Sequence, residues 1–221
     1  MMPTQLWFKF RDVLIFGVVA FVAVAVSSVG GRAAADKARK LVVFGDSLVA
    51  GYGVAANRAF PAQLEAALRA KGHKVAVINA GVSGDTTAAG LARFDWAIPP
   101  DASAVIVELG ANDALRGLPP KLARDNLGTI LSRLKARGLP VLLAGMRAPR
   151  NWGNDYATAF DAMYPALAKV HGVELYPFFL EGIALVDKFN QRDGMHPNEN
   201  GVAEIVRRVL PAVERLLARV K

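Results

Sequence analysis

The stretch KLVVFGDSLVAGYG, residues 40–53, places a serine where a buried strand should give way to a turn. Its apolar run, Leu41 to Phe44, passes abruptly into Gly-Asp-Ser-Leu and then into small residues and more glycine. A short apolar run of this kind favours a strand that is covered on both faces, as in a parallel sheet. Ser47 therefore lies at the carboxyl end of the predicted strand, in a turn that leads into a helix.

Four more apolar runs rich in Val, Ile and Leu follow along the chain, and segments with helical spacing separate them. The five predicted strands are 41–44, 74–79, 103–109, 139–145 and 172–176. The predicted helices are 60–72, 121–138, 155–172 and 198–220. Strands that alternate with helices are typical of right-handed β-α-β units and of a three-layer α/β/α sandwich. Ligands of such sheets bind beyond the carboxyl ends of the strands, so the turns after the strands are the place to look for a site.

The first 35 residues differ in composition from the rest. Two basic residues precede an uncharged run from Val13 to Gly31, and three alanines ending at Ala35 follow it. This order is typical of a secretory signal peptide, and we expect cleavage after Ala35. The alternative is an uncleaved anchor, since the run is slightly long for the apolar region of a signal peptide and slightly short for a membrane span. Residues 36–221 form the single predicted domain.

The overall composition excludes several classes of protein. With 53% hydrophobic and 21% charged residues, the 221-residue chain is globular and long enough for one well-buried domain. The net charge is +8, but the basic residues are scattered and not interleaved with aromatic ones. We therefore expect no nucleic-acid partner, while transient contact with an anionic membrane surface stays open. The absence of cysteine excludes disulfides, thiolate catalysis and cysteine-based zinc sites.

Ser47 is a candidate nucleophile if the chain supplies a base, because a serine hydroxyl is otherwise unreactive. Of the three histidines, His73 and His171 precede strands at the wrong edge of the sheet and read as solvated turn residues. His196 is the remaining candidate, and Asp193 three residues earlier can orient its ring. The competing interpretation is that Ser47 only caps a helix and that the other two are ordinary loop residues.

Two further turns offer donors for the oxyanion of a tetrahedral intermediate. Gly84 offers a backbone N–H that no side chain obstructs, and Asn112 offers a side-chain amide. With the backbone N–H of Ser47 these would make three donors, the arrangement that stabilises such an anion. Glycine and asparagine are also common as plain turn residues after a strand.

Together these motifs resemble the GDSL or SGNH hydrolase family, over essentially all of residues 40–215. The family is named for four residues, which are matched here by Ser47, Gly84, Asn112 and His196. The segments FGDSLVAGYG, NAGVSGDTTAAGLAR, ELGANDALRG, NWGNDYATAF and DGMHPNENGV are most similar to the bacterial branch of acyl-CoA thioesterase I, lysophospholipase L1 and arylesterase proteins. The resemblance implies a flavodoxin-like sheet of five parallel strands in the order 2-1-3-4-5.

The resemblance also implies a Ser47–His196–Asp193 triad that hydrolyses small-molecule carboxylic esters and thioesters through an acyl-enzyme. No metal or cofactor is expected. The candidates for an apolar substrate groove follow the third and fourth strands: Leu115, Leu118, Pro119, Met146, Pro149 and Trp152. Alternatively, these side chains only pack their own loops.

Two other functions compete with this prediction. A carbohydrate or peptidoglycan O-acetylesterase would use the same catalytic residues, and a non-catalytic binding protein would use the same edge of the sheet for a small ligand. The N-terminal segment predicts an exported enzyme, periplasmic or secreted, which would meet lysophospholipids and exogenous esters more readily than cytosolic acyl-CoA. The sequence does not indicate an oligomeric state.

Overall fold

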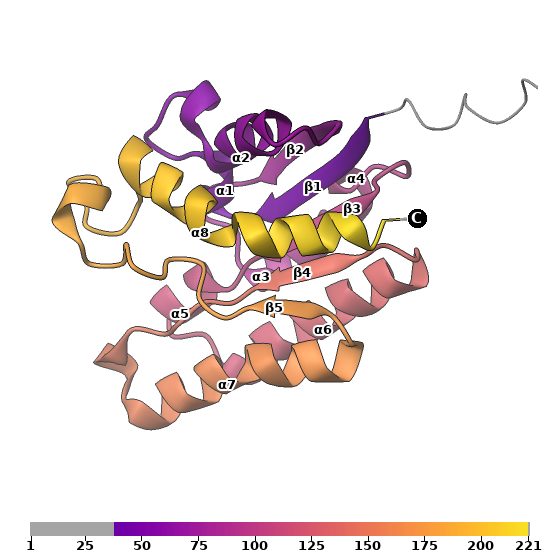
Figure 1. Ribbon diagram of the computed structural model, residues 1–221. Helices are drawn as coiled ribbons and strands as arrows, with labels where there is room; N and C mark the ends of the chain where they lie inside the picture. Colours follow the sequence, from indigo (N-terminus) through magenta and orange to yellow (C-terminus); the bar gives the residue numbers. More distant parts are fainter. Residues whose placement is uncertain (1–37, 221) are drawn as a thin grey trace, which may run out of the picture. The chain divides into compact units, whose positions relative to one another are not determined.

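Five parallel strands form one sheet in the order β2-β1-β3-β4-β5 (Figure 1). The computed structural model describes residues 38–220. The strands are β1 (Arg39–Gly45), β2 (Val75–Gly81), β3 (Ala104–Glu108), β4 (Val141–Ala144) and β5 (Glu174–Tyr176). Both the strand order and the parallel pairing confirm the prediction.

The central strands explain the continuous apolar runs in the sequence. Every residue of β3 and β4 is buried, as are the last five residues of β1, because helices cover both faces of the sheet. The outer strands β2 and β5 are mostly half-buried. Their position at the two edges of the sheet accounts for the weaker apolar pattern of residues 172–176.

Helices lie on both sides of the sheet and complete the three layers (Figure 1). They are α1 (Ser47–Ala50), α2 (Phe60–Ala70), α3 (Thr87–Ala92), α4 (Phe94–Ala97), α5 (Ala111–Leu115), α6 (Pro120–Ala136), α7 (Asn154–His171) and α8 (Glu199–Ala218). Three single-turn 3-10 helices lie at Ala56–Arg58, Arg150–Trp152 and Asp187–Phe189. Helix α2 packs against α8, while α6 packs against both α3 and α7. The four helices predicted from periodicity correspond to α2, α6, α7 and α8, with ends that differ by no more than a few residues.

The register of β1 brings three loops to one edge of the sheet. Gly45, at the carboxyl end of β1, lies opposite Gly81 of β2 and Glu108 of β3. The chain segments that follow these residues begin side by side at this edge. The predicted signal segment, 1–35, lies outside the described residues. Among residues 38–220, no helix is long and apolar enough to cross a membrane.

Candidate active site

The turn after β1 puts Ser47 at the first position of α1. Gly45 makes this turn possible, because a Cβ atom there would lie 2.4 Å from Val49 Cγ2 and 2.6 Å from the Glu108 carbonyl oxygen. The residue that caps α1 is Asp46, whose side chain accepts a hydrogen bond of 3.0 Å from the Leu48 N–H. The interpretation of Ser47 as a helix cap is therefore wrong.

The Ser47 hydroxyl instead faces an imidazole from the far end of the chain. Ser47 Oγ lies 2.9 Å from His196 Nε2, although the two residues are 149 positions apart. His196 Nδ1 lies 2.7 Å from Asp193 Oδ2. Asp193 Oδ1 accepts hydrogen bonds of 2.9 Å from the backbone N–H groups of Met195 and His196. These contacts join the three predicted residues in one unbroken chain of hydrogen bonds.

The hydrogen bonds to Asp193 also stabilise its charged form. Donation from the backbone N–H groups of His196 and Met195, and then from the His196 ring, lowers the pKa of Asp193 to about 2. Hydrogen bonds to the charged form of a carboxyl favour that form. Asp193 is thus ionised throughout the neutral range and orients His196 with its Nδ1–H toward the carboxylate.

The loop that carries His196 is tied to the segment after α1. Gln191 donates from its amide to the carbonyl oxygens of Tyr52 (2.7 Å) and Pro197 (2.9 Å). Gly53 leaves room for this contact, since a Cβ atom there would lie 2.0 Å from Gln191 Oε1. The Tyr52 ring packs beside His196 with a centroid separation of 4.6 Å. These contacts hold the His196 ring opposite the Ser47 hydroxyl.

Asn112 lies in the first turn of α5, next to the turn that carries Ser47. Its amide nitrogen donates to the carbonyl oxygen of Asp85 (2.9 Å) and to Asp46 Oδ2 (3.2 Å). Gly84 precedes Asp85 and has a positive φ of +85°, a backbone conformation that favours glycine. The Gly84 carbonyl accepts a hydrogen bond of 2.9 Å from Arg116. Thus the turn that contains Gly84 and the Asn112 side chain are hydrogen-bonded to each other.

The predicted groove residues divide into exposed and buried ones. Leu115 and Trp152 are about half exposed, Pro119 is exposed, and Leu118 and Pro149 are half-buried. Met146 is 5% exposed and belongs to the core. The Trp152 indole lies over Gly117, where a Cβ atom would come within 2.8 Å of the ring. The loop after β3 and the loop after β4 therefore touch at Trp152.

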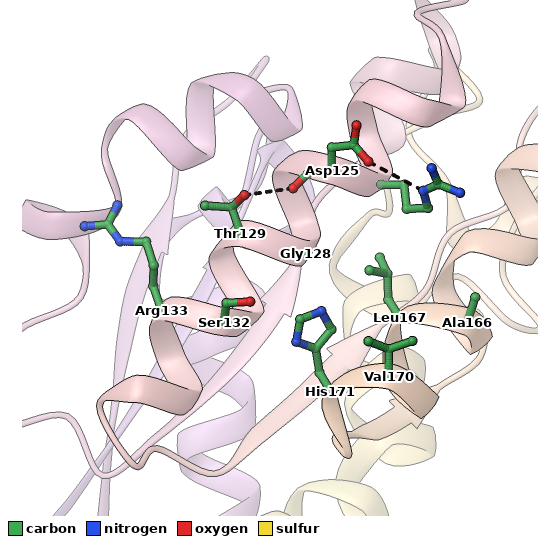
Figure 2. A pocket seen from close by; sticks show the side chains of 10 residues that line it. Asp125, Gly128, Thr129, Ser132, Arg133, Ala166, Leu167, Val170 and His171 are labelled. Carbon is green, nitrogen blue, oxygen red and sulfur yellow. Dashed lines mark hydrogen bonds and ion pairs between the residues drawn. The ribbon is translucent and has the colours of Figure 1, made fainter.

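The other two histidines lie away from this arrangement. His73 Nε2 is 3.2 Å from Glu214 Oε1 on α8, so His73 has a side-chain hydrogen-bond partner and is not simply a solvated turn residue. His171 ends α7, and burial with the nearby charge of Lys135 lowers its pKa. It lines a groove between α6 and α7 (Figure 2), which contains none of the predicted site residues.

Sequence reasoning missed a set of buried charges next to the site. Asp46 and Glu108 are fully buried, and Asp85 and Arg93 nearly so. Arg93 forms an ion pair with Asp85 (2.5 Å) and donates to the Gly45 carbonyl oxygen (2.8 Å). One sign of these charges was present in the predicted strand SAVIVEL, residues 103–109, where Glu108 is the charged residue in an otherwise mostly apolar run. Among the described residues, no group of three or more His, Asp or Glu could hold a metal ion.

Comparison with known proteins gives the family to which the chain is similar. Residues 43–203 match the model of the GDSL-like Lipase/Acylhydrolase family. An arylesterase of Vibrio mimicus is 42% identical over 180 residues, which cover 79% of this chain and 89% of that protein. Thioesterase 1/protease 1/lysophospholipase L1 of Escherichia coli K12 is 44% identical over 170 residues, covering 76% and 79%. The crystal structure of AlinE4, an SGNH-hydrolase family esterase, has 48% identity and a TM-score of 0.69, covering 82% and 97%.

The fold and these matches define the chain as a hydrolase with the SGNH fold. More particularly, the chain belongs to the GDSL-like lipase/acylhydrolase family, and it is an esterase.

Proposed function

We propose that this chain hydrolyses small-molecule carboxylic esters and thioesters through an acyl-enzyme formed on Ser47. The observation that carries the proposal is the continuous hydrogen-bonded chain from Ser47 Oγ through His196 to Asp193, with distances of 2.9 and 2.7 Å. The names of the relatives, arylesterase and thioesterase 1, support the two bond types.

In the first half of the reaction, His196 Nε2 takes the proton of the Ser47 hydroxyl as Oγ attacks the substrate carbonyl. The carboxylate of Asp193 keeps the other ring proton on Nδ1 and stabilises the imidazolium that forms. The imidazolium then protonates the departing alcohol or thiol, which leaves Ser47 acylated. In the second half, His196 takes a proton from water, the hydroxide attacks the acyl-enzyme, and Ser47 regains its proton.

The oxyanion of each tetrahedral intermediate would accept hydrogen bonds from the backbone N–H groups of Ser47 and Gly84 and from the Asn112 amide. In the structure the Asn112 amide has two protein acceptors, at 2.9 and 3.2 Å. The oxyanion would share the hydrogen of the longer of these bonds, the one to Asp46. Because both acceptors fix the amide before substrate arrives, little reorganisation is needed during the reaction.

The surroundings of the triad suit small acyl or aryl groups. The segments that follow β1, β3 and β4 and the loop before α8 carry exposed large apolar side chains: Tyr52, Leu115, Trp152 and Met195. They offer apolar contact to a substrate without enclosing it. Contact with a membrane surface would be transient. The N-terminal segment, with its signal-like pattern, supports export to the periplasm or out of the cell.

A panel of p-nitrophenyl esters from acetyl to palmitoyl, with lysophosphatidylcholine and an acyl-CoA alongside, tests the proposal. We expect hydrolysis of short and medium acyl esters and of the thioester, and none by Ser47→Ala. An acetyl-only profile would favour the O-acetylesterase alternative. Intact mass after treatment with an organophosphonate is the second measurement, and we expect one adduct, on Ser47. A protein that forms no adduct and hydrolyses no ester would be a binding protein.

A further inference from the structure

Two carboxyl groups meet in the core beside Ser47, outside the proposed triad. Asp46 directly precedes Ser47, and Glu108 ends β3 opposite Gly45. Both side chains are fully buried. The Asp46 N–H points to Glu108 Oε2 at 3.4 Å, and a Cβ atom on Gly45 would lie 2.7 Å from that oxygen. The glycine of the Gly-Asp-Ser-Leu motif thus makes space for the carboxyl group of Glu108.

The two carboxyl groups have different hydrogen-bond partners. Asp46 accepts from the Leu48 N–H through Oδ1 (3.0 Å) and from the Asn112 amide through Oδ2 (3.2 Å). Glu108 Oε1, in contrast, is buried and has no hydrogen-bond partner within residues 38–220. An unpartnered buried oxygen costs much less free energy on a neutral acid than on a carboxylate. The geometry therefore favours a negative charge on Asp46 and a proton on Glu108.

The charged groups around the pair do not neutralise it directly. Arg93 reaches the Gly45 carbonyl oxygen but is already paired with Asp85. His196, from the loop before α8, has its Nε2 at 2.9 Å from Ser47 Oγ, and Tyr164 of α7 donates its hydroxyl to the Leu109 carbonyl oxygen. Among residues 38–220, neither carboxyl forms a salt bridge, and the neighbouring Arg93 is paired with Asp85, so a proton held within the pair would lower its net charge.

Burial acts on both acids in the same direction. It raises the pKa of Asp46 to about 6, with hydrogen bonds from Leu48 and neighbouring side chains opposing the shift. Burial, and next the charge of Asp46, raise the pKa of Glu108 well above its ordinary value. Two adjoining buried carboxyl groups lose their protons in two separated steps because the first charge opposes the second.

We propose that Asp46 and Glu108 form a carboxyl pair that holds one proton near neutral pH, on Glu108, and that the Asp46 carboxylate positions the Asn112 amide for the oxyanion. The inference rests on the proposed function, because it deepens the role of Asn112 there. A single carboxylate bonded to both Leu48 and Asn112 fixes the nucleophile's helix and the oxyanion donor relative to each other.

Kinetics of Asp46→Asn and Glu108→Gln test the charge assignment. An asparagine at 46 can turn an amide N–H toward the N–H of Asn112, so we expect kcat to fall by about 100-fold with little change in KM. A glutamine at 108 reproduces a neutral acid, and we expect kcat to fall only several-fold. A Glu108→Gln variant as impaired as Asp46→Asn would overturn the assignment.

A double-mutant cycle tests whether Asp46 acts through Asn112. Asn112→Ala removes the amide and lowers kcat by itself. If Asp46 only positions that amide, adding Asp46→Asn to Asn112→Ala lowers kcat no further. If Asp46 has only a structural role, Asp46→Asn lowers kcat by the same factor in both backgrounds. That result would refute the positioning role.

Infrared spectroscopy tests the proton without requiring turnover. At neutral pH, the wild-type minus Glu108→Gln difference spectrum should contain the carbonyl stretch of a protonated carboxylic acid. Absence of that band refutes the shared proton, even if Asp46→Asn does not fold. A chain with the band but with no phosphonate adduct on Ser47 would instead refute the proposed function alone.

Discussion

Tyr52 lies against the ring of His196, with the ring centroids 4.6 Å apart and the ring planes inclined by 40°. The backbone carbonyl of the same tyrosine accepts the Gln191 amide, so Tyr52 contacts the histidine loop twice. Since Tyr52 follows α1 directly, it joins the segment that carries Ser47 to the loop that carries His196. Its ring packs against the imidazole and restricts the positions that the imidazole can take.

Replacing Tyr52 by alanine should lower kcat/KM for p-nitrophenyl acetate by roughly 2- to 10-fold, the range expected when an aromatic pair worth about 0.5–1.5 kcal/mol is lost. Tyr52→Phe is the matched control, because it keeps the ring and lacks only the hydroxyl. Initial-rate kinetics on both variants distinguish the effect of ring packing from that of the hydroxyl. Equal losses in the two variants would assign the effect to the hydroxyl and not to ring packing.

Asp193→Asn should reduce kcat by about 10⁴-fold while leaving the fold unchanged. An asparagine can keep Oδ1 as acceptor for the N–H groups of Met195 and His196, which Asp193 Oδ1 serves at 2.9 Å. Its amide then donates toward His196 Nδ1 and forces the ring proton onto Nε2, where it blocks proton transfer from Ser47. Single-turnover kinetics measure the loss of rate, and circular dichroism checks that the fold is unchanged. A loss of less than tenfold would contradict the orienting role of Asp193.

The stability difference between wild type and Asp46→Asn should depend on pH between about 4 and 6. Burial raises the pKa of Asp46 from 3.8 to about 6, so the folded state binds a proton that the unfolded state has released in this window. The free energy of unfolding contributed by Asp46 therefore falls as pH rises from 4 to 6 and is constant above that range. Urea denaturation at several pH values compares the two proteins. A difference that grows with pH would have the wrong sign for a buried acid.

Gly45→Ala should destabilise the fold by at least about 1–3 kcal/mol, the usual cost of overpacking. The new Cβ would lie 2.6 Å from a backbone oxygen of Glu108, which has no rotamer to move out of the way. Gly128→Ala is the matched control in α6, because its Cβ would meet only Leu167 at 3.5 Å and His171 at 3.7 Å. There we expect a gain of about 0.4–1 kcal/mol from helix propensity and chain entropy. Thermal denaturation of the two variants should move in opposite directions.

The placement of Ser47 and His196 at one edge of the sheet could be predicted because it follows from the chain path, whereas the strand order 2-1-3-4-5 was predicted from the resemblance to the GDSL or SGNH hydrolase family. Parallel strands joined by helices bring the ends of strands together, whatever the details of packing. The contact of Asp193 with the His196 ring could be predicted for another reason, because the two residues are only three positions apart.

The pairing of Asp46 with Glu108 could not be predicted in the same way. The two residues are 62 positions apart, and their contact depends on the register between β1 and β3. The sequence shows an acid after an apolar strand but not what that acid faces. Likewise, the sequence does not distinguish Asp46 from its neighbour Ser47 as the residue that caps α1. The geometry of the turn shows that Asp46 is the cap.

The separation of 149 positions between Ser47 and His196 has a consequence for biosynthesis. The proposed nucleophile is made first, and its proposed base and helix α8, which packs on α2, are made later. A growing polypeptide on the ribosome therefore contains Ser47 long before it contains the histidine that would activate this serine. Under the proposed mechanism, hydrolytic activity begins only after translation has passed His196, and a product of premature termination before that codon would be inert.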